Sequence, residues 1–513
     1  MALKNKYEVI IVGYGPLGQL CGLLLSKLGV RTAIIERKKD VNPLPRASVV
    51  DGESLRFTNT INIYSEIKNL FNTPEFLDYS LPNGKIIQRS IVRETSDGYT
   101  NVSTFYQPDL EVALRKKISE SDHIDLYLQH ELISFKEEED KISVKSKDMS
   151  KNKLIEIESN YLLACDGVNS SIRKKLKISS EDLKYNKDWL IVDIDTKDKS
   201  LMNNTIRQIC DFERPTSFTF LSNKRYRWEF QLLPGEKRDE MLQDKKIFSL
   251  LEKYIDKNIY SINRKDIYKF KAECSRHWLK NKTILLGGAA YQLPPFGYQS
   301  LNSEIRDINN LCWKLSLVLK NKCKPDILLS YNAEREPVAK ETISSSLAMG
   351  QLIDSIAVSF KKNIPLEESV PPEARIQAFK DSRNSLEGAE KNKKIFYDSD
   401  VTKSFSSSMP NFYMMIDKER VLFDNLLGLN FCIFTAGKYD FSKKIFKFLE
   451  EINAKIYDTT NMVCEDMFMK ESFKNHSFIV RPDRMIFGVS DNDNSLEIIC
   501  EDLMRKLFFI NQK

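Results

Sequence analysis

The sequence contains few histidines and no closely spaced cysteines. Its four histidines, at positions 123, 130, 277 and 476, do not cluster, so we predict no metal site and no catalytic histidine. The cysteines number nine, which is odd, and none belongs to a Cys-x-x-Cys motif. A disulfide framework or a zinc site is therefore disfavoured, and we expect reduced thiols in a cytoplasmic protein.

Long apolar runs are also missing. No stretch of about 18 apolar residues occurs, so we expect neither an export signal nor a membrane span. Lys and Arg total 78 against 72 for Asp and Glu, which leaves a net charge of only +6. Because the lysines are spread along the chain, we predict no nucleic-acid partner. At 513 residues the chain is too long for one ordinary core, and we expect two or three domains.

The first informative stretch lies near the N-terminus. Tyr7–Val12 is short, β-branched and followed by glycine, which predicts a buried parallel strand. The turn Gly13-Tyr14-Gly15-Pro16-Leu17-Gly18 leads into a helical segment, and a second strand, Thr32–Ile35, ends at Glu36. This is a Gly-x-Gly-x-x-Gly fingerprint with a strand before it, a helix after it and an acid at the end of the second strand.

Each residue of that fingerprint has a physical task. Gly13 permits the tight turn, Gly15 lets the backbone approach a pyrophosphate, and Gly18 lets the helix pack on the strand. Glu36 can accept hydrogen bonds from a ribose diol. The pattern predicts adenine-dinucleotide binding, and the alternative is a glycine turn without a ligand.

A second strand, turn and helix start occurs at Tyr161–Ala164 followed by Asp166-Gly167 and Arg173. An aspartate at a strand end can accept a bond from a ribityl or ribose hydroxyl, and Arg173 can offer charge to a phosphate. Arg46 follows the second strand of the fingerprint, where an arginine either reaches the cofactor or forms a surface ion pair.

A third such stretch spans residues 284–315. The apolar Ile284–Leu286 runs into Gly287-Gly288, then a Pro294-Pro295 break, a second turn and a helix. A strand end facing a helix N-terminus suits an anionic or electron-rich ligand. Between the second and third stretches, from about residue 189 to 270, alternating polar and apolar residues predict an inserted antiparallel sheet.

These three motifs, in this order, resemble the FAD-dependent aromatic hydroxylases, the class A flavoprotein monooxygenases built like p-hydroxybenzoate hydroxylase. Within that family the chain looks most like the hydroxyphenylpropionate hydroxylase branch. The resemblance covers nearly the whole chain. It implies an α/β fold, with a Rossmann-like FAD-binding domain, an inserted antiparallel substrate sheet and a C-terminal thioredoxin-like α/β domain without redox cysteines. The expected boundaries are 1–185 with 273–345 for the FAD domain, 186–272 for the sheet, 346–401 for a helical linker segment and 402–513 for the last domain.

The resemblance also implies a reaction. The expected protein is an oxidoreductase that uses NAD(P)H to reduce FAD, and dioxygen then forms a flavin hydroperoxide that hydroxylates a phenolic or related aromatic molecule. Backbone N–H groups of Leu301 and Asn302, at a helix N-terminus, would stabilise negative charge on the reduced ring, and Pro295 would shape the wall beside it. For the assembly of the protein, a homodimer is one of the expected alternatives.

Besides Pro295, Leu301 and Asn302, which are the predicted catalytic residues, the predicted site residues fall into two sets. The cofactor-binding residues are Gly13, Gly15, Pro16, Leu17, Gly18, Glu36, Arg37, Arg46, Gln107, Asp166, Gly167, Arg173, Gly287, Gly288, Gln299, Ser300, Leu301 and Asn302. The substrate candidates, whose residue types are more often explained by core or sheet packing, are Gln208, Phe218, Phe220, Arg227 and Trp228.

Several positions depart from the family pattern. Gly288 stands where the family has an aspartate that holds a ribityl hydroxyl, and Tyr291 stands where histidine is usual. Tyr298 and Ser300 interrupt a glycine-rich run, and Glu304 replaces a small residue early in the helix. The alternative function is therefore a family-derived flavoprotein with a degraded or altered flavin site, acting as a non-hydroxylating enzyme or as a binding or scaffold protein.

Overall fold

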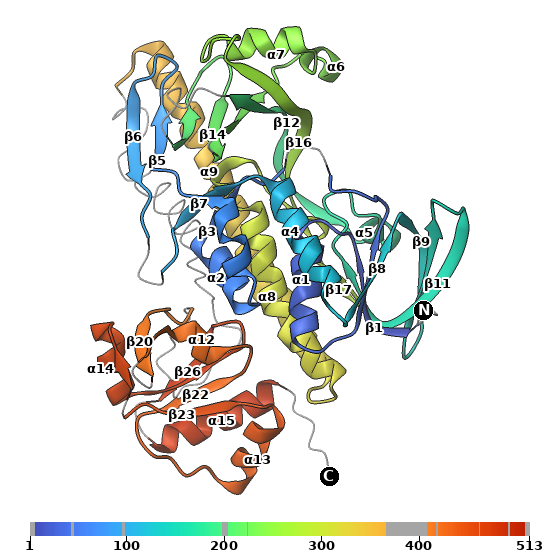
Figure 1. Cartoon of the computed structure of the whole chain (residues 1–513), viewed down its shortest axis with the longest axis vertical. Helices are drawn as coiled ribbons and strands as arrows, with labels where there is room; N and C mark the ends of the chain where they lie inside the picture. Colours follow the sequence, from blue (N-terminus) through green and yellow to red (C-terminus); the bar gives the residue numbers. More distant parts are fainter. Residues whose placement is uncertain are drawn as a thin grey trace.

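The computed structural model describes residues 6–42, 46–94, 98–196, 204–222, 224–365, 408–416, 419–460, 462–490 and 493–507. Figure 1 shows three parts stacked along the long axis of the molecule, with an antiparallel sheet at one end, a mixed α/β domain in the centre and the C-terminal domain at the other end. This arrangement confirms the predicted fold class.

An eight-stranded sheet with a parallel core forms the centre of the middle domain. Its strands are β1 (Lys6–Val12), β2 (Thr32–Glu36), β8 (Ile124–Leu128), β9 (His130–Glu137), β10 (Ile142–Asp148), β11 (Lys153–Ala164), β17 (Leu279–Lys280) and β18 (Thr283–Leu285). The order is β17-β18-β11-β1-β2-β8, and the central members β18, β11, β1, β2 and β8 are parallel. The predicted first strand is confirmed, and its residues Val9–Ile11 are completely buried.

Helices and a small sheet surround this core. The α-helices are α1 (Pro16–Lys27), α2 (Gly52–Thr60), α3 (Tyr64–Ile67), α4 (Gln107–Ser119), α5 (Ser171–Lys175), α8 (Ser300–Leu319) and α9 (Leu329–Lys362). The 3-10 turns are η1 (Lys68–Leu70), η2 (Gly287–Ala289), η3 (Phe296–Tyr298) and η4 (Pro325–Leu328), and the small sheet holds β3 (Val49–Asp51), β4 (Phe71–Asn72) and β7 (Val102–Phe105). Helix α1 packs between α4 and α8, so the fingerprint turn lies beside the start of α8.

The inserted sheet is larger than its sequence pattern predicted. Its strands are β5 (Phe76–Ser80), β6 (Ile86–Ile91), β12 (Ser180–Thr196), β13 (Thr205–Ile209), β14 (Thr216–Ser222), β15 (Arg225–Gln231), β16 (Tyr260–Ser275) and β19 (Tyr291–Gln292), and its helices are α6 (Arg238–Met241) and α7 (Asp244–Leu251). The order is β19-β16-β12-β15-β14-β13-β5-β6. Strands β5 and β6 come from the first third of the chain. They join this sheet through β5, which pairs with β13 in parallel.

The C-terminal domain contains a four-stranded and a three-stranded sheet. Its strands are β20 (Tyr413–Ile416), β21 (Glu419–Leu422), β22 (Cys432–Thr435), β23 (Lys455–Asp458), β24 (Val463–Cys464), β25 (Ser477–Val480) and β26 (Ile486–Ser490). Its helices are α12 (Phe423–Leu427), α13 (Lys443–Glu451), α14 (Met467–Asn475) and α15 (Asp493–Lys506). The order β23-β22-β25-β26, with one parallel and two antiparallel pairings, is the thioredoxin-like arrangement that the resemblance implied.

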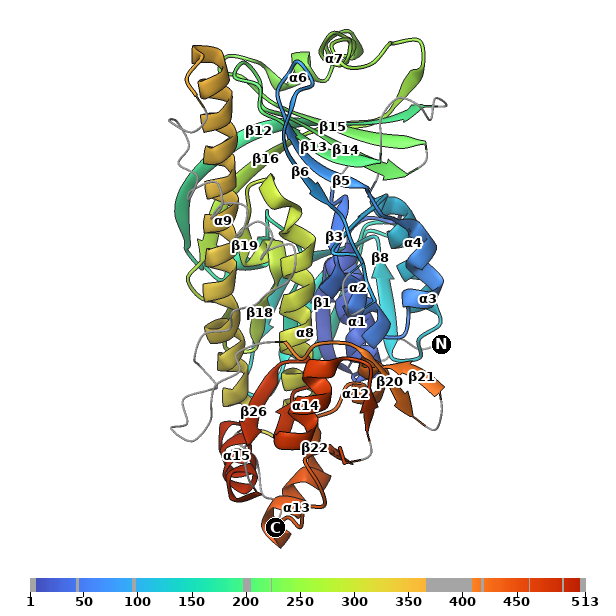
Figure 2. The same ribbon diagram turned by 90° about the vertical axis from the view of Figure 1, so that its left-hand side faces the viewer.

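Helix α9 crosses one of the predicted boundaries. It runs to Lys362, so the boundary expected at residue 346 falls inside a continuous helix, and most of the predicted linker lies outside the described residues. Figure 2 shows α9 as a long helix that lies along the antiparallel sheet and the central domain. With η4, over Pro325–Lys362, it is long and apolar enough to span a bilayer by length and composition, yet half of its most apolar window is buried inside the molecule, as in core helices of globular proteins.

Candidate active site

The fingerprint turn lies at the carboxyl end of β1, between α1 and the end of β11. A Cβ atom on Gly13, whose φ is +109°, would collide with the carbonyl oxygen of Cys165, and one on Gly18 would collide with the carbonyl oxygen of Gly13. A Cβ on Gly15 would meet no atom of the described residues within 4 Å. Two glycines therefore hold the packing, and the third leaves open space above the backbone where a pyrophosphate would lie. Pro16 and Leu17 begin α1.

Glu36 is held in place at the end of β2. Its Oε2 accepts a hydrogen bond from the backbone N–H of Tyr14 at 2.9 Å, and its Oε1 accepts one from the N–H of Lys38 at 2.8 Å. These bonds orient the carboxylate beside the fingerprint turn, where it can still accept bonds from ribose hydroxyls. Arg37, the next residue, is exposed.

The turn after β11 presents one carboxylate oxygen without a partner. Asp166 Oδ2 accepts from the backbone N–H groups of Ser171 (2.7 Å) and Ile172 (3.3 Å). Its Oδ1 is buried and has no hydrogen-bond partner in the part of the chain that the structure describes. A buried orphan acceptor is costly, so this atom is suited to a ligand hydroxyl. Gly167 continues the turn with a φ of +74°.

Arg173 forms hydrogen bonds to backbone carbonyls, whereas its charge had suggested a contact with a phosphate. Its guanidinium donates to the carbonyl oxygens of Ala289 at 2.7 Å and Val168 at 3.0 Å. The side chain thus fastens the turn after β18 to the turn after β11. The arginine shapes the crevice by these bonds to carbonyls.

Helix α8 begins without a side-chain cap among the described residues. Its first-turn N–H groups, including those of Leu301 and Asn302, therefore lack the capping oxygen that many helices supply. Asn302 is completely buried, and its Oδ1 accepts from the N–H of Asp51 at 3.1 Å and from Ser54 Oγ at 2.7 Å. The helix start is thereby fastened to β3 and α2. Gln299 is buried before it and Ser300 is exposed.

The turn after β18 carries the main departure from the predicted geometry. The N–H of Gly288 donates to Glu304 Oε1 at 3.0 Å, so a carboxylate does lie at this turn, although it comes from α8. Burial raises the pKa of Glu304 to about 7, and nearby Asp307 adds to the rise. The Glu304 side chain thus lies between the turn after β18 and Leu17 of α1.

Tyr291 is accommodated in the core. Its hydroxyl lies 2.7 Å from Asp307 Oδ2 and 2.9 Å from Ser303 Oγ, and its ring stacks on Trp278. Asp307 is also paired with Arg335 at 2.8 Å. The tyrosine that replaces the usual histidine therefore belongs to a satisfied buried network.

Tyr298 connects the start of α8 to the antiparallel sheet. It has a φ of +56°, which is uncommon for a residue with a side chain. Its hydroxyl lies 3.3 Å from Thr219 Oγ1, and its ring packs against the apolar cluster that contains Val102 and Ile206. Burial raises the pKa of this phenol. The ring takes up space between the sheet and the helix start.

The two faces of the antiparallel sheet divide the predicted substrate residues. Phe218, Phe220 and Trp228 lie in the aromatic core that also contains Ile247 and Leu251 of α7, so they face away from the nucleotide turns. Their strand neighbours point to the opposite face, because side chains alternate along a strand. That polar face holds Ser217, Thr219, Arg227 and Glu229.

Arg227 is completely committed to protein partners. It pairs with Asp193 at 2.7 Å and also donates to the carbonyl oxygen of Arg46. Arg264 pairs with the same aspartate at 2.5 Å. Glu229 accepts from Ser217 Oγ at 3.0 Å, and its pKa is raised by burial. Asp193 and Ser217 were not among the predicted site residues, although strand alternation would have placed them on this face.

Two further predicted residues lie nearby. Gln107 begins α4 and donates to Glu111 at 2.6 Å, while its buried Oε1 has no partner within the described ranges. Gln208 donates to the carbonyl oxygen of Thr216 at 3.0 Å. The exposed Arg46 lies over the ring of Tyr268, and Pro295 is half-buried before η3.

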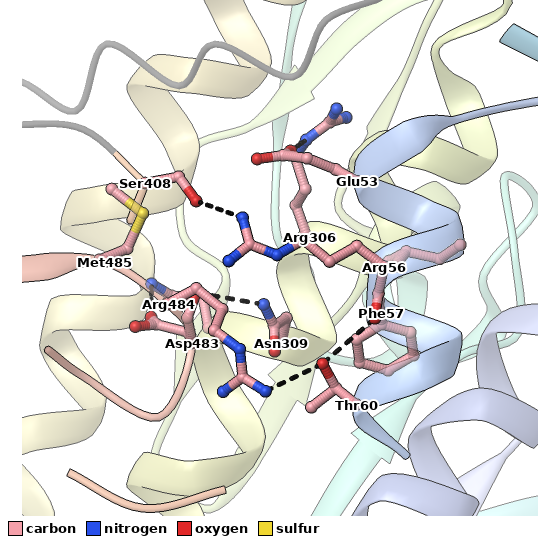
Figure 3. A pocket seen from close by; sticks show the side chains of 12 residues that line it. Glu53, Arg56, Phe57, Thr60, Arg306, Asn309, Ser408, Asp483, Arg484 and Met485 are labelled. Atoms are coloured by element: carbon pink, nitrogen blue, oxygen red, sulfur yellow. Dashed lines mark hydrogen bonds and ion pairs between the residues drawn. The ribbon is translucent and has the colours of Figure 1, made fainter. Parts of the chain in front are cut away.

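A separate cavity of about 50 Å³ lies between α2, α8 and the C-terminal domain (Figure 3). Arg56, Arg306 and Arg484 line it, and each is paired with an acid: Arg56 and Arg484 with Asp424, and Arg306 with Glu53. This charge balance marks a domain interface. No cluster of metal ligands occurs among the residues that the structure describes.

Most of the dinucleotide end of the crevice suits FAD, but one side chain there conflicts with FAD binding. The open space over Gly15, the oriented Glu36 and the orphan oxygen of Asp166 suit a dinucleotide with a polyol chain. Glu304 conflicts with this fit, because its carboxylate already accepts from the Gly288 N–H.

Comparisons with known proteins agree with this geometry. The chain is 28% identical over 352 residues, 68% of its length, to 3-(3-hydroxy-phenyl)propionate/3-hydroxycinnamic acid hydroxylase from Comamonas testosteroni, and 25% identical over 353 residues to the enzyme of that name from Escherichia coli (strain K12). The alignments span 59% and 63% of those relatives.

Solved structures share the fold across 98% of this chain. The flavin-dependent monooxygenase PieE, in complex with FAD and substrate, has a TM-score of 0.82 at 16% identity, over 99% of its own chain. Aklavinone-11 hydroxylase, in complex with FAD and aklavinone, has a TM-score of 0.78 at 17% identity, also over 99% of its chain. The family model described as "FAD binding domain" matches residues 6–346, and the chain belongs to this FAD-binding family.

Proposed function

We propose that the protein is an FAD-dependent monooxygenase that uses NAD(P)H and dioxygen to hydroxylate a phenolic or related aromatic small molecule. The observation that carries the proposal is the convergence of three nucleotide-binding turns, after β1, β11 and β18, on one crevice beside the start of α8. The hydroxylase names of the curated relatives support the same reaction class.

The residues of the crevice divide the work of holding FAD. The backbone at Gly15 and the N-terminus of α1 hold the pyrophosphate, and Glu36 binds the adenosine ribose. Asp166 Oδ1 and Gln107 Oε1 accept from hydroxyls of the ribityl chain, since both oxygens are buried and otherwise without a partner among described residues. Bound FAD supplies the redox chemistry that protein side chains lack.

The rest of the site controls charge and water. The uncapped N-terminus of α8 stabilises negative charge near Leu301 and Asn302. Pro295 and the polar face of the antiparallel sheet enclose the substrate and exclude water. Gln208 and Thr219 are better placed to contact it than Phe218, Phe220 and Trp228, which face α7.

The substrate is a small aromatic molecule with a phenolic hydroxyl, as the names of the relatives suggest. Arg227 is bound to Asp193, so it acts on the substrate only by shaping the polar face. We infer a cytoplasmic protein, in keeping with nine cysteines that are all free thiols. A homodimer remains one of the predicted forms of assembly.

A second function is favoured by two observations. Glu304 holds the Gly288 N–H, and Tyr298 fills space below the sheet. These contacts suit a family-derived flavoprotein whose site no longer hydroxylates and which serves as a binding or scaffold protein.

One experiment separates the two functions. Purified protein is first tested for flavin absorbance, before and after incubation with FAD. Oxidation of NADH and NADPH is then measured with 3-(3-hydroxyphenyl)propionate and with the same acid lacking the hydroxyl. The masses of the products are determined by mass spectrometry. Hydroxylated product from the phenol supports the monooxygenase. Protein that binds FAD but yields no hydroxylated product from any phenol tested supports the second function.

A further inference from the structure

Glu304 occupies a confined position that its place in the helix does not require. It lies just after the first turn of α8, yet its side chain extends to the turn after β18, where Oε1 accepts from the Gly288 N–H at 3.0 Å. A Cβ built on Gly287 would lie 2.5 Å from Glu304 Cγ and 2.7 Å from a terminal carbon of Leu17. The glutamate is therefore wedged between the β18 turn and the first turn of α1.

This position is also the one that suits a ligand anion. The first turn of α1 has no side-chain cap within the described chain, so its N–H groups face the crevice. The Gly288 N–H points to the same place, and the Glu304 carboxylate is the anion that now accepts from it. A carboxylate at a backbone donor beside a helix N-terminus imitates a phosphate oxygen.

The surroundings do not neutralise this carboxylate. Asp307 approaches it from the same helix, Cys165 from the end of β11 and Tyr291 from β19, and the one cation that acts on it is the exposed Arg46 among the residues described. Burial raises its pKa to about 7. A carboxylate in this environment is held at a cost, and a bound diphosphate would add repulsion between like charges.

We propose that Glu304 is an internal competitor of the cofactor, whose carboxylate occupies the Gly288 N–H and the space beside Leu17 that an oxygen of the FAD diphosphate or ribityl chain requires. This inference rests on the proposed FAD function and adds that Glu304 weakens the binding of FAD. The protein would be isolated with little FAD and would bind added FAD weakly until Glu304 is displaced.

The test uses the full-length protein and two substitutions that separate charge from volume. Glu304→Gln keeps the size and an oxygen that accepts from Gly288, and Glu304→Gly removes the side chain. Glu341→Gln, at an exposed position of α9, is the matched control. FAD affinity is measured at pH 8, where Glu304 is mainly ionised, by titration calorimetry and by quenching of FAD fluorescence, and circular dichroism verifies the fold of each variant.

The expected result is a graded gain in affinity. Glu304→Gln should bind FAD about 10-fold more tightly than the wild type, Glu304→Gly more tightly still, and Glu341→Gln the same as the wild type. Equal FAD affinity in all four proteins would overturn the inference and leave the proposed function standing. Failure of all four to bind FAD would overturn the proposed function, and the inference with it.

Discussion

At the residue scale, the glycines of the crevice differ in what surrounds them. Gly13 and Gly18 touch neighbouring backbone, so a side chain at either position disrupts the packing of α1 on the sheet. Gly15 faces open space with an extended backbone at a φ of −75°, which any residue can adopt. Adding a side chain therefore disrupts packing at Gly18, whereas at Gly15, three residues earlier, it only fills open space.

We predict that Gly15→Val keeps the fold and loses FAD, because its side chain enters the space above the turn. Thermal unfolding should match the wild type, while FAD affinity falls by at least about 100-fold. Gly18→Val is the matched comparison and should unfold at a clearly lower temperature. Equal flavin uptake by Gly15→Val and wild type would contradict the assignment of this turn.

Gly288 illustrates how a neighbour changes the expected effect of a mutation. Restoring the family aspartate by Gly288→Asp places a Cβ 3.1 Å from the Val168 nitrogen and a second carboxylate beside Glu304. We predict that this single change does not tighten FAD binding. Combined with Glu304→Gly it should tighten binding about 10-fold beyond Glu304→Gly alone. A tighter single mutant, measured by the same titration, would show that the two carboxylates do not compete.

At the element scale, the antiparallel sheet is held by a buried charge cluster on its polar face. Asp193 of β12 pairs with Arg227 and Arg264, and these two guanidinium groups keep its pKa below the ordinary value despite burial. Two arginines share one carboxylate, so the cluster depends on that residue.

We predict that Asp193→Asn destabilises the protein by about 3–5 kcal/mol, because it leaves two buried guanidinium groups without their counter-ion. Asp195→Asn, two residues further along β12, is the matched control. Its ion pair with Arg225 is partly exposed and should contribute at most about 1 kcal/mol. Urea unfolding of both variants measures the difference, and similar losses would show that the buried cluster is dispensable.

At the scale of the whole molecule, a second buried network joins three parts of the chain. Glu334 of α9 pairs with Lys314 of α8 and with Arg481 of the C-terminal domain, each at 2.8 Å. Although burial opposes ionisation, Arg481 and Lys314 lower the pKa of Glu334 to about 2. Burial lowers the pKa of Lys314 to about 8, and nearby Arg481 adds to this effect. The network thus contributes to the docking of the last domain.

The pH dependence of this network has a definite sign. The folded pKa of Glu334 is below its ordinary value of 4.5, so its contribution is present above pH 4.5 and is lost as the pH falls toward 2. We predict that Glu334→Gln loses about 3–5 kcal/mol at pH 7 and much less at pH 3. Urea unfolding at both pH values tests this. A loss that does not shrink at pH 3 would show that repacking, and not the charge, causes the effect.

The sequence by itself determined the order and type of the elements that build the site. Strand, glycine turn and helix are set by residues close together in the chain, so Gly13–Gly18 with Glu36, the Asp166 turn and the turn after Ile284 could be identified from spacing. The antiparallel character of residues 189–270 was likewise readable from alternation. The recruitment of β5 and β6 into that sheet was not, because strand pairing across more than 100 residues leaves no local pattern.

Only the tertiary structure decided what several side chains do. Phe218 and Trp228 face α7, Arg173 binds carbonyl oxygens, and Glu304 reaches Gly288 across the crevice. Each outcome depends on which face of an element is covered and on what lies within about 3 Å in space. A carboxylate 16 positions away along the chain became the partner of Gly288 because α8 packs against the turn after β18, and that proximity is a property of the packed fold.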